Sequence, residues 1–457
     1  MKIFILLLLV WGVFVDTPSA AARETMKGPL FDYVAKADAS YHWTKRQEGS
    51  LSAGSYVELL LISQTWRDTV WKHQLYIIKP STVAADARHA LLFIGGGRWS
   101  KELEGPGHGT QLPNEAELFG RLAEHLQTPV AILRHVPHQP LLGGRNEDQL
   151  IALTFEEYLQ TRDPEWPLLL PMVKSAVRAM DAVQAYTEQA WSLKIETFTV
   201  TGASKRGWTT WLTGAVDPRA TAIAPMVIDM LNLNAHLQHQ EAVWGRLSPK
   251  LGDYTERGLH KQLETEGGRA LQAIVDPYSY RHLLTQPKLI MIGTNDPYWP
   301  LDALNLYWDE LEGRNYILYV PNNGHSLRDY PRIIGSLSAL HQHVANGKRL
   351  PALSWGFNED KGKLSLHIES DIQPRQVVAW IALSATQDFH EAQWQSYPMQ
   401  AEGDGYRYEL ALPNQGYAAV FGEAVYDDGD ATLPYFLSTK VRIIQAPANS
   451  SNRPTEP

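Results

Sequence analysis

Short apolar runs alternate with longer amphipathic stretches through the middle of the chain. Six runs have the length of buried strands: they are residues 90–94, 129–133, 197–201, 222–228, 288–292 and 315–320. Between them, residues 168–190 place apolar side chains at mixed three- and four-residue spacing, which predicts a helix packed on a sheet. Strands that alternate with helices predict a mostly parallel, doubly wound sheet covered on both faces.

The pattern changes on either side of this region and once within it. Residues 57–65 and 73–78 predict paired strands that open the sheet. Residues 232–284 are polar, rich in His and Gln and too long for a simple crossover, so we expect a helical cap there. After residue 350, short alternating segments without helical periodicity predict a β-sandwich of immunoglobulin type over 351–445.

The two ends differ from the globular part. One lysine, an apolar run to Val15 and the small residues Ser19 to Ala22 predict a signal peptide over 1–22. Asp16 and Pro18 end the apolar run short of the ~20 residues that a bilayer requires. We therefore expect a periplasmic or secreted protein without a stable membrane anchor, in which 23–350 form the first domain. Residues 446–457, rich in Pro, Ser and Asn, predict a disordered tail.

Composition excludes several classes of function. The net charge of -9, without a block of like charge, argues against nucleic acid binding. The absence of cysteine excludes disulfides, thiolate nucleophiles and thiolate metal sites, and it favours a bacterial periplasm over a eukaryotic extracellular space. Several histidines lie in the predicted cap, but no tight ligand motif accompanies them, so we expect neither a metal nor a cofactor.

Ser204 has the sequence context of a nucleophile. The predicted strand 197–201 runs into Gly202-Ala203-Ser204, and a stretch able to form a helix follows. Such a strand-turn-helix pushes the serine hydroxyl out of the sheet and directs the next N–H, that of Lys205, at a developing oxyanion. In the usual motif a second glycine comes two residues after the serine, whereas here Arg206 has that place and Gly207 follows it.

The order of residues along the chain supplies the remaining members of a catalytic triad. Asp296 follows the strand 288–292, and His325 follows the strand 315–320. This is the order of an α/β-hydrolase, in which the histidine takes the serine proton and the acid orients the imidazole. Asp229, after an earlier strand, is the alternative acid, and Asp302 is a lesser one.

Three further groups are candidates for contact with the substrate. Gly96 and Gly97 follow the strand 90–94, and their N–H groups either complete an oxyanion hole or belong to a turn that only reverses the chain. Arg98 and Arg206 either clamp a substrate carboxylate or are ordinary surface charges. Trp299 lines a substrate pocket or packs in the core.

Four segments resemble the PhoPQ-activated pathogenicity-related proteins. They are 202–211, 227–232, 293–296 and 320–326. The resemblance implies an α/β-hydrolase domain with a β-sandwich behind it, similarity to serine peptidases and esterases, and a link to virulence and antimicrobial peptide resistance. It also implies that the arginine two residues after Ser204 is the family's own pattern. The Ser-Lys-Arg start of the helix is similar to glucuronoyl esterases as well, in which an arginine beside the nucleophile binds the sugar carboxylate.

We therefore expect an exported serine hydrolase that cleaves an ester or peptide bond through an acyl-enzyme on Ser204. A non-catalytic binding protein on the same fold and a carbohydrate esterase similar to the glucuronoyl esterases are the alternatives. The substrate stays open between a small molecule, a glycan and a peptide, and the oligomeric state stays open as well.

Overall fold

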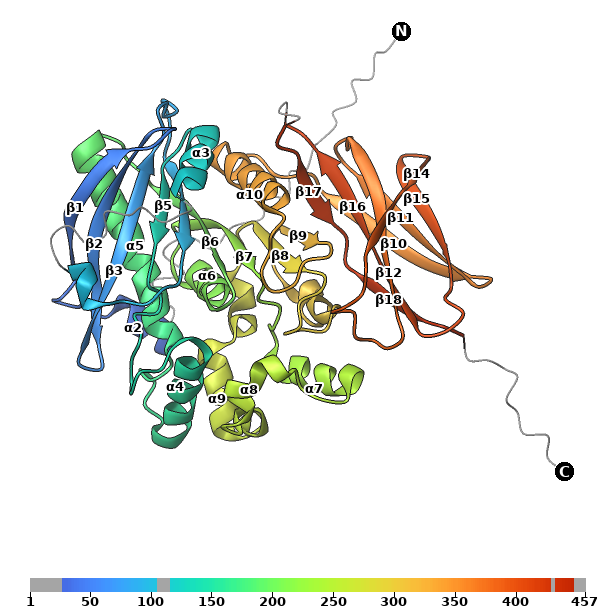
Figure 1. Cartoon of the computed structure of the whole chain (residues 1–457), viewed down its shortest axis with the longest axis horizontal. Helices are drawn as coiled ribbons and strands as arrows, with labels where there is room; N and C mark the ends of the chain where they lie inside the picture. The colour runs from blue at the N-terminus through green and yellow to red at the C-terminus, as the bar shows by residue number, and fades with distance from the viewer. Residues whose placement is uncertain (1–26, 105–115, 429–431, 448–457) are drawn as a thin grey trace, which may run out of the picture.

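A computed structural model describes residues 27–104, 116–428 and 432–447 (Figure 1). The predicted signal peptide, 1–22, lies outside the described residues, as does the predicted tail from residue 448 onward.

One large mixed sheet runs through the protein. Its first nine strands in chain order are β1 (His42–Ser50), β2 (Ser55–Trp66), β3 (Thr69–Lys79), β4 (His89–Ile94), β5 (Val130–Leu133), β6 (Thr197–Ala203), β7 (Ala220–Met226), β8 (Lys288–Gly293) and β9 (Asn315–Val320). They are arranged in the order β1-β2-β3-β5-β4-β6-β7-β8-β9, and the strands from β5 to β9 in this order run parallel. Each of the six predicted apolar runs forms one of the strands β4 to β9, and the expected antiparallel opening pair is β2 and β3. The fold is the predicted doubly wound α/β-hydrolase fold.

Strand β1 was missing from the prediction. It pairs with β2 at the edge of the sheet, and all of its side chains are exposed or half-buried. An edge strand of this kind carries too few apolar side chains to show a strand pattern.

Helices cover both faces of this sheet. One face is packed by α2 (Pro29–Ala35), α5 (Leu169–Trp191) and α6 (Lys205–Val216), and the other by α3 (Ala116–Leu126) and α10 (Tyr330–Ala345). Side chains along a strand alternate between the two cores, since Ala90 and Leu92 belong to the α5 side and Leu91 belongs to the α10 side. The predicted helix over 168–190 is α5.

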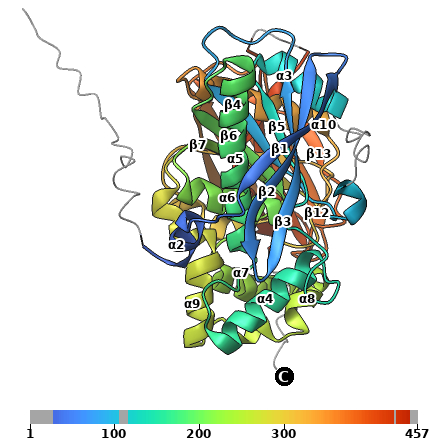
Figure 2. The same cartoon turned by 90° about the vertical axis from the view of Figure 1, so that its left-hand side faces the viewer.

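A helical cap covers one end of the sheet. Figure 1 and Figure 2 show its helices gathered below the strands. They are α4 (Glu147–Thr161), α7 (Leu233–Trp244), α8 (Gly252–Thr255) and α9 (Glu266–Val275), with short 3-10 helices at Pro249–Leu251, Leu259–Gln262 and Pro277–Leu283. Asp276 fixes the two ends of the cap to each other, because its carboxylate accepts from the N–H of Leu233 at 2.8 Å and of Tyr278 at 2.9 Å.

The chain beyond α10 forms two packed sheets. One has the order β10-β11-β15-β14, and the other contains β12, β13 and β16 to β18. Their bounds are β10 (Leu353–Asp360), β11 (Lys363–Ser370), β12 (Gln376–Ser384), β13 (Gln395–Pro398), β14 (Gln400–Glu402), β15 (Gly405–Ala411), β16 (Tyr417–Tyr426), β17 (Tyr435–Ser438) and β18 (Arg442–Gln445). Leu364, Leu366 and Ile368 of β11 share one apolar core with Ala379 of β12 and Val420 of β16, which makes this region a sandwich.

The second of these sheets continues the hydrolase sheet, which the sequence did not predict. Strand β17 pairs with β9 at Ser438 and Ile317, and the Ser438 hydroxyl accepts the N–H of Tyr319 at 3.0 Å. The pairing satisfies part of the edge of β9.

In the part of the chain that the structure describes, no helix combines the length and the apolar character needed to cross a membrane.

Candidate active site

Ser204 occupies a strained turn between β6 and α6. Its backbone has φ 58° and ψ -124°, a conformation that non-glycine residues rarely adopt and that is found at catalytic turns. The neighbouring backbone approaches closely, because a Cβ on Gly207 would lie 2.8 Å from the carbonyl oxygen of Met226 and 3.0 Å from that of Gly202. Gly207 therefore supplies the close approach, although it stands one residue later than in the usual motif.

His325 and Asp296 meet Ser204 in one chain of hydrogen bonds. The imidazole Nε2 lies 2.9 Å from Ser204 Oγ, and Nδ1 lies 2.8 Å from Asp296 Oδ2. In the tautomer with its proton on Nδ1, His325 donates to the carboxylate and accepts the hydroxyl proton. The three residues come from the carboxyl ends of β6, β8 and β9, so the parallel strands bring together positions far apart in sequence.

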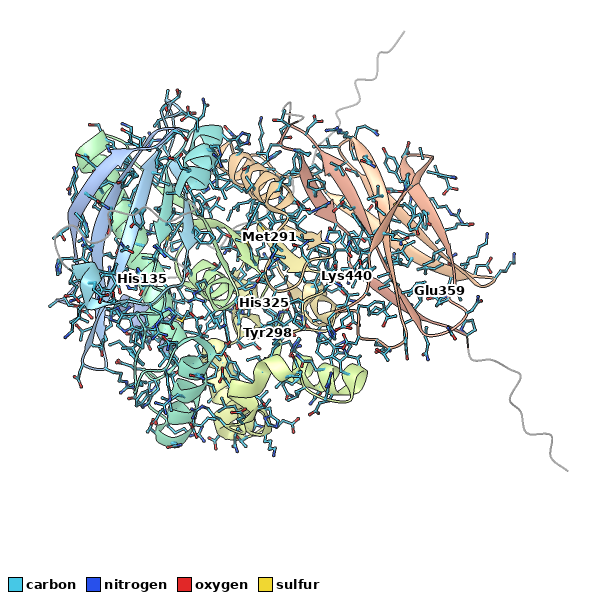
Figure 3. All side chains as sticks on the ribbon, viewed as in Figure 1. His135, Met291, Tyr298, His325, Glu359 and Lys440 are labelled. Carbon is cyan, nitrogen blue, oxygen red and sulfur yellow. The ribbon has the colours of Figure 1, made fainter. Side chains whose placement is uncertain are left out.

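Tyr298 holds the imidazole from one side. Its ring stacks on that of His325, with centroids 4.2 Å apart and planes at 30°. The N–H of Tyr298 also donates to Asp296 Oδ1 at 3.0 Å, so one residue contacts both Asp296 and His325. Figure 3 shows His325 and Tyr298 side by side between the sheet and the cap. No pattern in the sequence predicts this stacking.

The alternative acids have other partners. Asp229 is fully buried and accepts the hydroxyl of Tyr307 at 2.7 Å, and burial raises the pKa of its carboxyl to about 7. Asp302 lies 2.7 Å from the Nε2 of His239. Asp296 is therefore the carboxylate that lies beside His325, whereas Asp229 and Asp302 are bonded to other residues.

The glycine loop after β4 is shaped by two close contacts. A Cβ on Gly96 would lie 2.3 Å from Arg206 Nη2, and one on Gly97, whose φ is 128°, would lie 2.8 Å from His135 Nδ1. The carbonyl of Gly96 accepts the N–H of His135 at 3.0 Å, which fixes the loop to the end of β5. Gly96 also lines the same cleft as His325. A side chain at either glycine would collide with its neighbours, so packing alone accounts for both glycines. Both remain candidates for the oxyanion hole as well.

Arg206 is held by other residues of the protein, whereas its sequence position left a clamp for a substrate carboxylate and an ordinary charge both open. Its guanidinium forms two parallel hydrogen bonds to Glu147, at 2.7 Å and 2.6 Å, and its Nε donates to the Val136 carbonyl at 2.6 Å. Burial opposes ionisation of Glu147, but the bonds from Arg206 prevail and lower the pKa of that carboxyl. Each of the three nitrogens of the Arg206 guanidinium donates one hydrogen bond within the protein, so the residue joins α6 to the start of α4.

Of the other candidate substrate contacts, Trp299 and Lys205 line the cavity beside Ser204 and Arg98 does not. Trp299 is buried and lines the same cavity as Ser204 and Lys205. The ammonium of Lys205 lies 2.7 Å from Asp148. Arg98 is exposed and lines neither that cavity nor the cleft beside His325.

Within the described ranges, no group of three or more His, Asp or Glu side chains gathers as a metal ion would require.

Known proteins resemble this chain at two levels. The "Autocrine proliferation repressor protein A" of Dictyostelium discoideum is 31% identical over 437 residues, which cover 87% of this chain and 86% of that protein. Among solved structures, an acetyl xylan esterase from Thermoanaerobacterium has a TM-score of 0.45 at 13% identity, over 69% of this chain and 91% of that one. A glucuronoyl esterase from Solibacter usitatus has a TM-score of 0.41 at 14% identity, over 69% and 91%. The model of one family matches residues 30–390, and the chain belongs to that family, the PhoPQ-activated pathogenicity-related proteins.

Proposed function

We propose that the protein is a serine hydrolase that cleaves an ester or peptide bond through an acyl-enzyme on Ser204. The observation that carries this proposal is the chain of hydrogen bonds from Asp296 through His325 to Ser204, with heavy-atom distances of 2.8 Å and 2.9 Å. Distances of 2.6–3.2 Å between nucleophile, base and orienting acid are those that this chemistry requires.

In the proposed reaction, Ser204 Oγ attacks the acyl carbon while its proton passes to His325 Nε2. His325 returns that proton to the leaving group, and water then repeats the sequence to release the acid. Asp296 keeps the imidazole in the productive tautomer and stabilises its charge. We assign the oxyanion to the N–H groups of Lys205 and of the glycine loop at Gly96 and Gly97.

The carbohydrate esterase alternative loses one of its supports. It depended on an arginine near the nucleophile that binds a sugar carboxylate, and the guanidinium of Arg206 is held by Glu147 and Val136. The cavity that meets Ser204 is bordered mainly by leucine and aromatic side chains, which offer few hydrogen bonds to a sugar.

We infer export from the apolar run near Met1 and the small residues before residue 23. The family's description connects it with a PhoPQ-activated response and with pathogenicity. An exported hydrolase of this family is accordingly proposed to act in that response outside the cytoplasm.

Labelling with a fluorophosphonate probe tests the proposal. We expect one adduct, located on Ser204 by mass spectrometry, and its loss in Ser204→Ala and His325→Ala. Asp296→Asn is expected to label far more slowly, since loss of the orienting acid lowers turnover by about 10⁴-fold in related triads. Asp302→Asn removes a carboxylate that also contacts a histidine and is the matched control, expected to label normally. A folded protein that does not react at Ser204 would favour the non-catalytic binding protein.

A further inference from the structure

An apolar cavity lies between the nucleophile and the cap. It has a free volume of about 100 Å³, and Ser204 and Tyr298 border it where it meets the triad. The cap contributes its apolar wall, mainly through leucine side chains: Leu233, Leu237, Leu247, Leu251, Leu259 and Leu271. We call this space the cap cavity.

A second and larger space borders His325. It has a free volume of about 490 Å³ and is bordered by His325, Gly96 and apolar side chains of α3 and α10, such as Phe119 and Ile334. We call it the α3–α10 cleft. Ser204 borders the cap cavity and His325 borders the α3–α10 cleft.

This division assigns the two halves of a substrate, given the proposed acyl-enzyme chemistry on which the inference rests. The acyl carbon becomes bonded to Ser204 Oγ, so the acyl chain extends into the space that Ser204 borders. The bond from that carbon to the leaving group breaks as His325 Nε2 delivers its proton, so the leaving group extends into the space that His325 borders. No further reactant takes part in this step.

The size of the cap cavity limits the acyl chain. An engineered apolar cavity of about 150 Å³ binds benzene, which has six carbons. By the same proportion, 100 Å³ holds an alkyl group of about four carbons.

The charges that border the cavity are matched to one another. Lys205 Nζ lies 2.7 Å from Asp148 Oδ2, and the Tyr254 hydroxyl donates to Asp148 Oδ1 at 2.9 Å. A charged acyl chain would have to displace one of these partners and enter an apolar space, which costs free energy. A neutral chain has no such cost.

We propose that the substrate carries a compact, neutral, apolar acyl group of about four carbons beyond the carbonyl, which the cap cavity accepts, and that its leaving group occupies the α3–α10 cleft. A branched aliphatic side chain of a peptide and a short fatty acyl chain share this chemistry.

A series of p-nitrophenyl esters from acetyl to decanoyl tests the proposal on the full-length protein. Each buried methylene strengthens binding by roughly fourfold. We therefore expect kcat/KM to rise at least about tenfold from the acetyl to the pentanoyl ester, and to fall from the octanoyl ester onward. Matched amide substrates with leucine or with aspartate before the scissile bond extend the test to peptides, and the leucine substrate is expected to be preferred.

One variant distinguishes a change in the size of the cavity from a loss of activity through unfolding. Leu237→Ala removes three carbons from the cavity wall, so it is expected to move the optimum chain length up by about three carbons. Unfolding lowers all rates together and does not produce such a shift. Glu241→Ala, on the same helix but exposed, is the matched control and is expected to keep the wild-type optimum.

The outcomes distinguish this inference from the proposed function. If Ser204 reacts with the fluorophosphonate but the acetyl ester is hydrolysed best, or Leu237→Ala leaves the optimum unchanged, the cap cavity does not hold the acyl chain and the serine hydrolase stands. If Ser204 does not react, the proposed function itself is wrong.

Discussion

Asn322 and Trp394 exchange two hydrogen bonds across 72 residues of sequence. The Asn322 side chain donates to the Trp394 carbonyl at 3.1 Å and accepts the Trp394 N–H at 2.8 Å. Asn295, the residue before Asp296, likewise donates to the carbonyl of Ala392 at 2.7 Å. The loops that carry His325 and Asp296 are therefore both fixed to a segment between β12 and β13, so the sandwich contributes to the geometry of the triad.

Asn322→Ala tests this support. The change removes two hydrogen bonds and leaves buried backbone groups without partners, which costs about 1–3 kcal/mol. We expect the rate of fluorophosphonate labelling at Ser204 to fall by about tenfold while the protein stays folded, because a small displacement of His325 suffices to weaken the triad. Asn346→Ala, at the far end of α10, is the control. Equal labelling rates in both variants would show that the sandwich does not position the histidine.

The ring of Tyr298 is expected to stabilise the imidazolium of His325 that the proposed reaction forms. A cation over an aromatic face gains about 0.5–1 kcal/mol at exposed sites and more when desolvated. Burial raises the pKa of Tyr298 to about 12, so the side chain is a neutral phenol at working pH. Tyr298→Ala should lower the labelling rate by roughly fivefold, and Tyr298→Phe, which keeps the ring, should retain it. A loss of the same size in both variants would point to the hydroxyl instead of the stacking.

The parallel strands and the ends of β6, β8 and β9 were predictable because local patterns determine them. A buried strand needs a continuous apolar run, and the residue after it reaches the same edge of the sheet as its neighbours. Ser204, Asp296 and His325 each follow such a run, which is why their order along the chain identifies them as candidates.

Arg206 shows what such patterns miss. Its partner, Glu147, is 59 residues earlier and follows a loop that no motif marks. The contact between Asn322 and Trp394 and the pairing of β17 with β9 depend in the same way on parts of the chain that meet only after folding. Polar partners at such distances leave no periodicity in the sequence, so the sequence could not decide between a substrate clamp and an ordinary charge for Arg206.

Removing Glu147 alone should destabilise the protein more than removing both Glu147 and the charge of Arg206. The Arg206 side chain is 11% exposed, so Glu147→Ala leaves a buried cation without its anion and is expected to cost about 3 kcal/mol or more. Adding Arg206→Met removes that cation and should restore part of the loss. Urea unfolding of the wild type, the single variant and the double variant measures these free energies. A double variant that is less stable than Glu147→Ala alone would contradict the argument.

The same double variant tests whether Arg206 serves only to join α6 to α4. If the guanidinium serves only the framework, the folded double variant still reacts with the fluorophosphonate at Ser204. A double variant with normal stability that no longer labels at Ser204 would show that Arg206 takes part in the active site.

Asp229 is expected to make the stability of the protein depend on pH. Burial, with a smaller contribution from the carboxylates of Asp296 and Asp302, raises the pKa of Asp229 from 3.8 to about 7, while the Tyr307 hydroxyl opposes the shift. A folded-state pKa above the unfolded one means that the folded protein holds the proton more tightly. The contribution is therefore complete below about pH 4 and is lost as the pH rises through about 7, by at most about 4 kcal/mol.

Asp229→Asn provides the comparison, because an amide resembles the protonated carboxyl and does not titrate. Between pH 4.5 and pH 8, we expect the wild type to lose stability relative to Asp229→Asn, with the difference constant above about pH 8. Urea unfolding at several pH values measures this difference. Asp404→Asn, an exposed position in the sandwich, serves as the control. Parallel stability curves for the wild type and Asp229→Asn would mean that the carboxyl ionises as readily in the folded as in the unfolded protein, so that its burial in the core costs nothing at neutral pH.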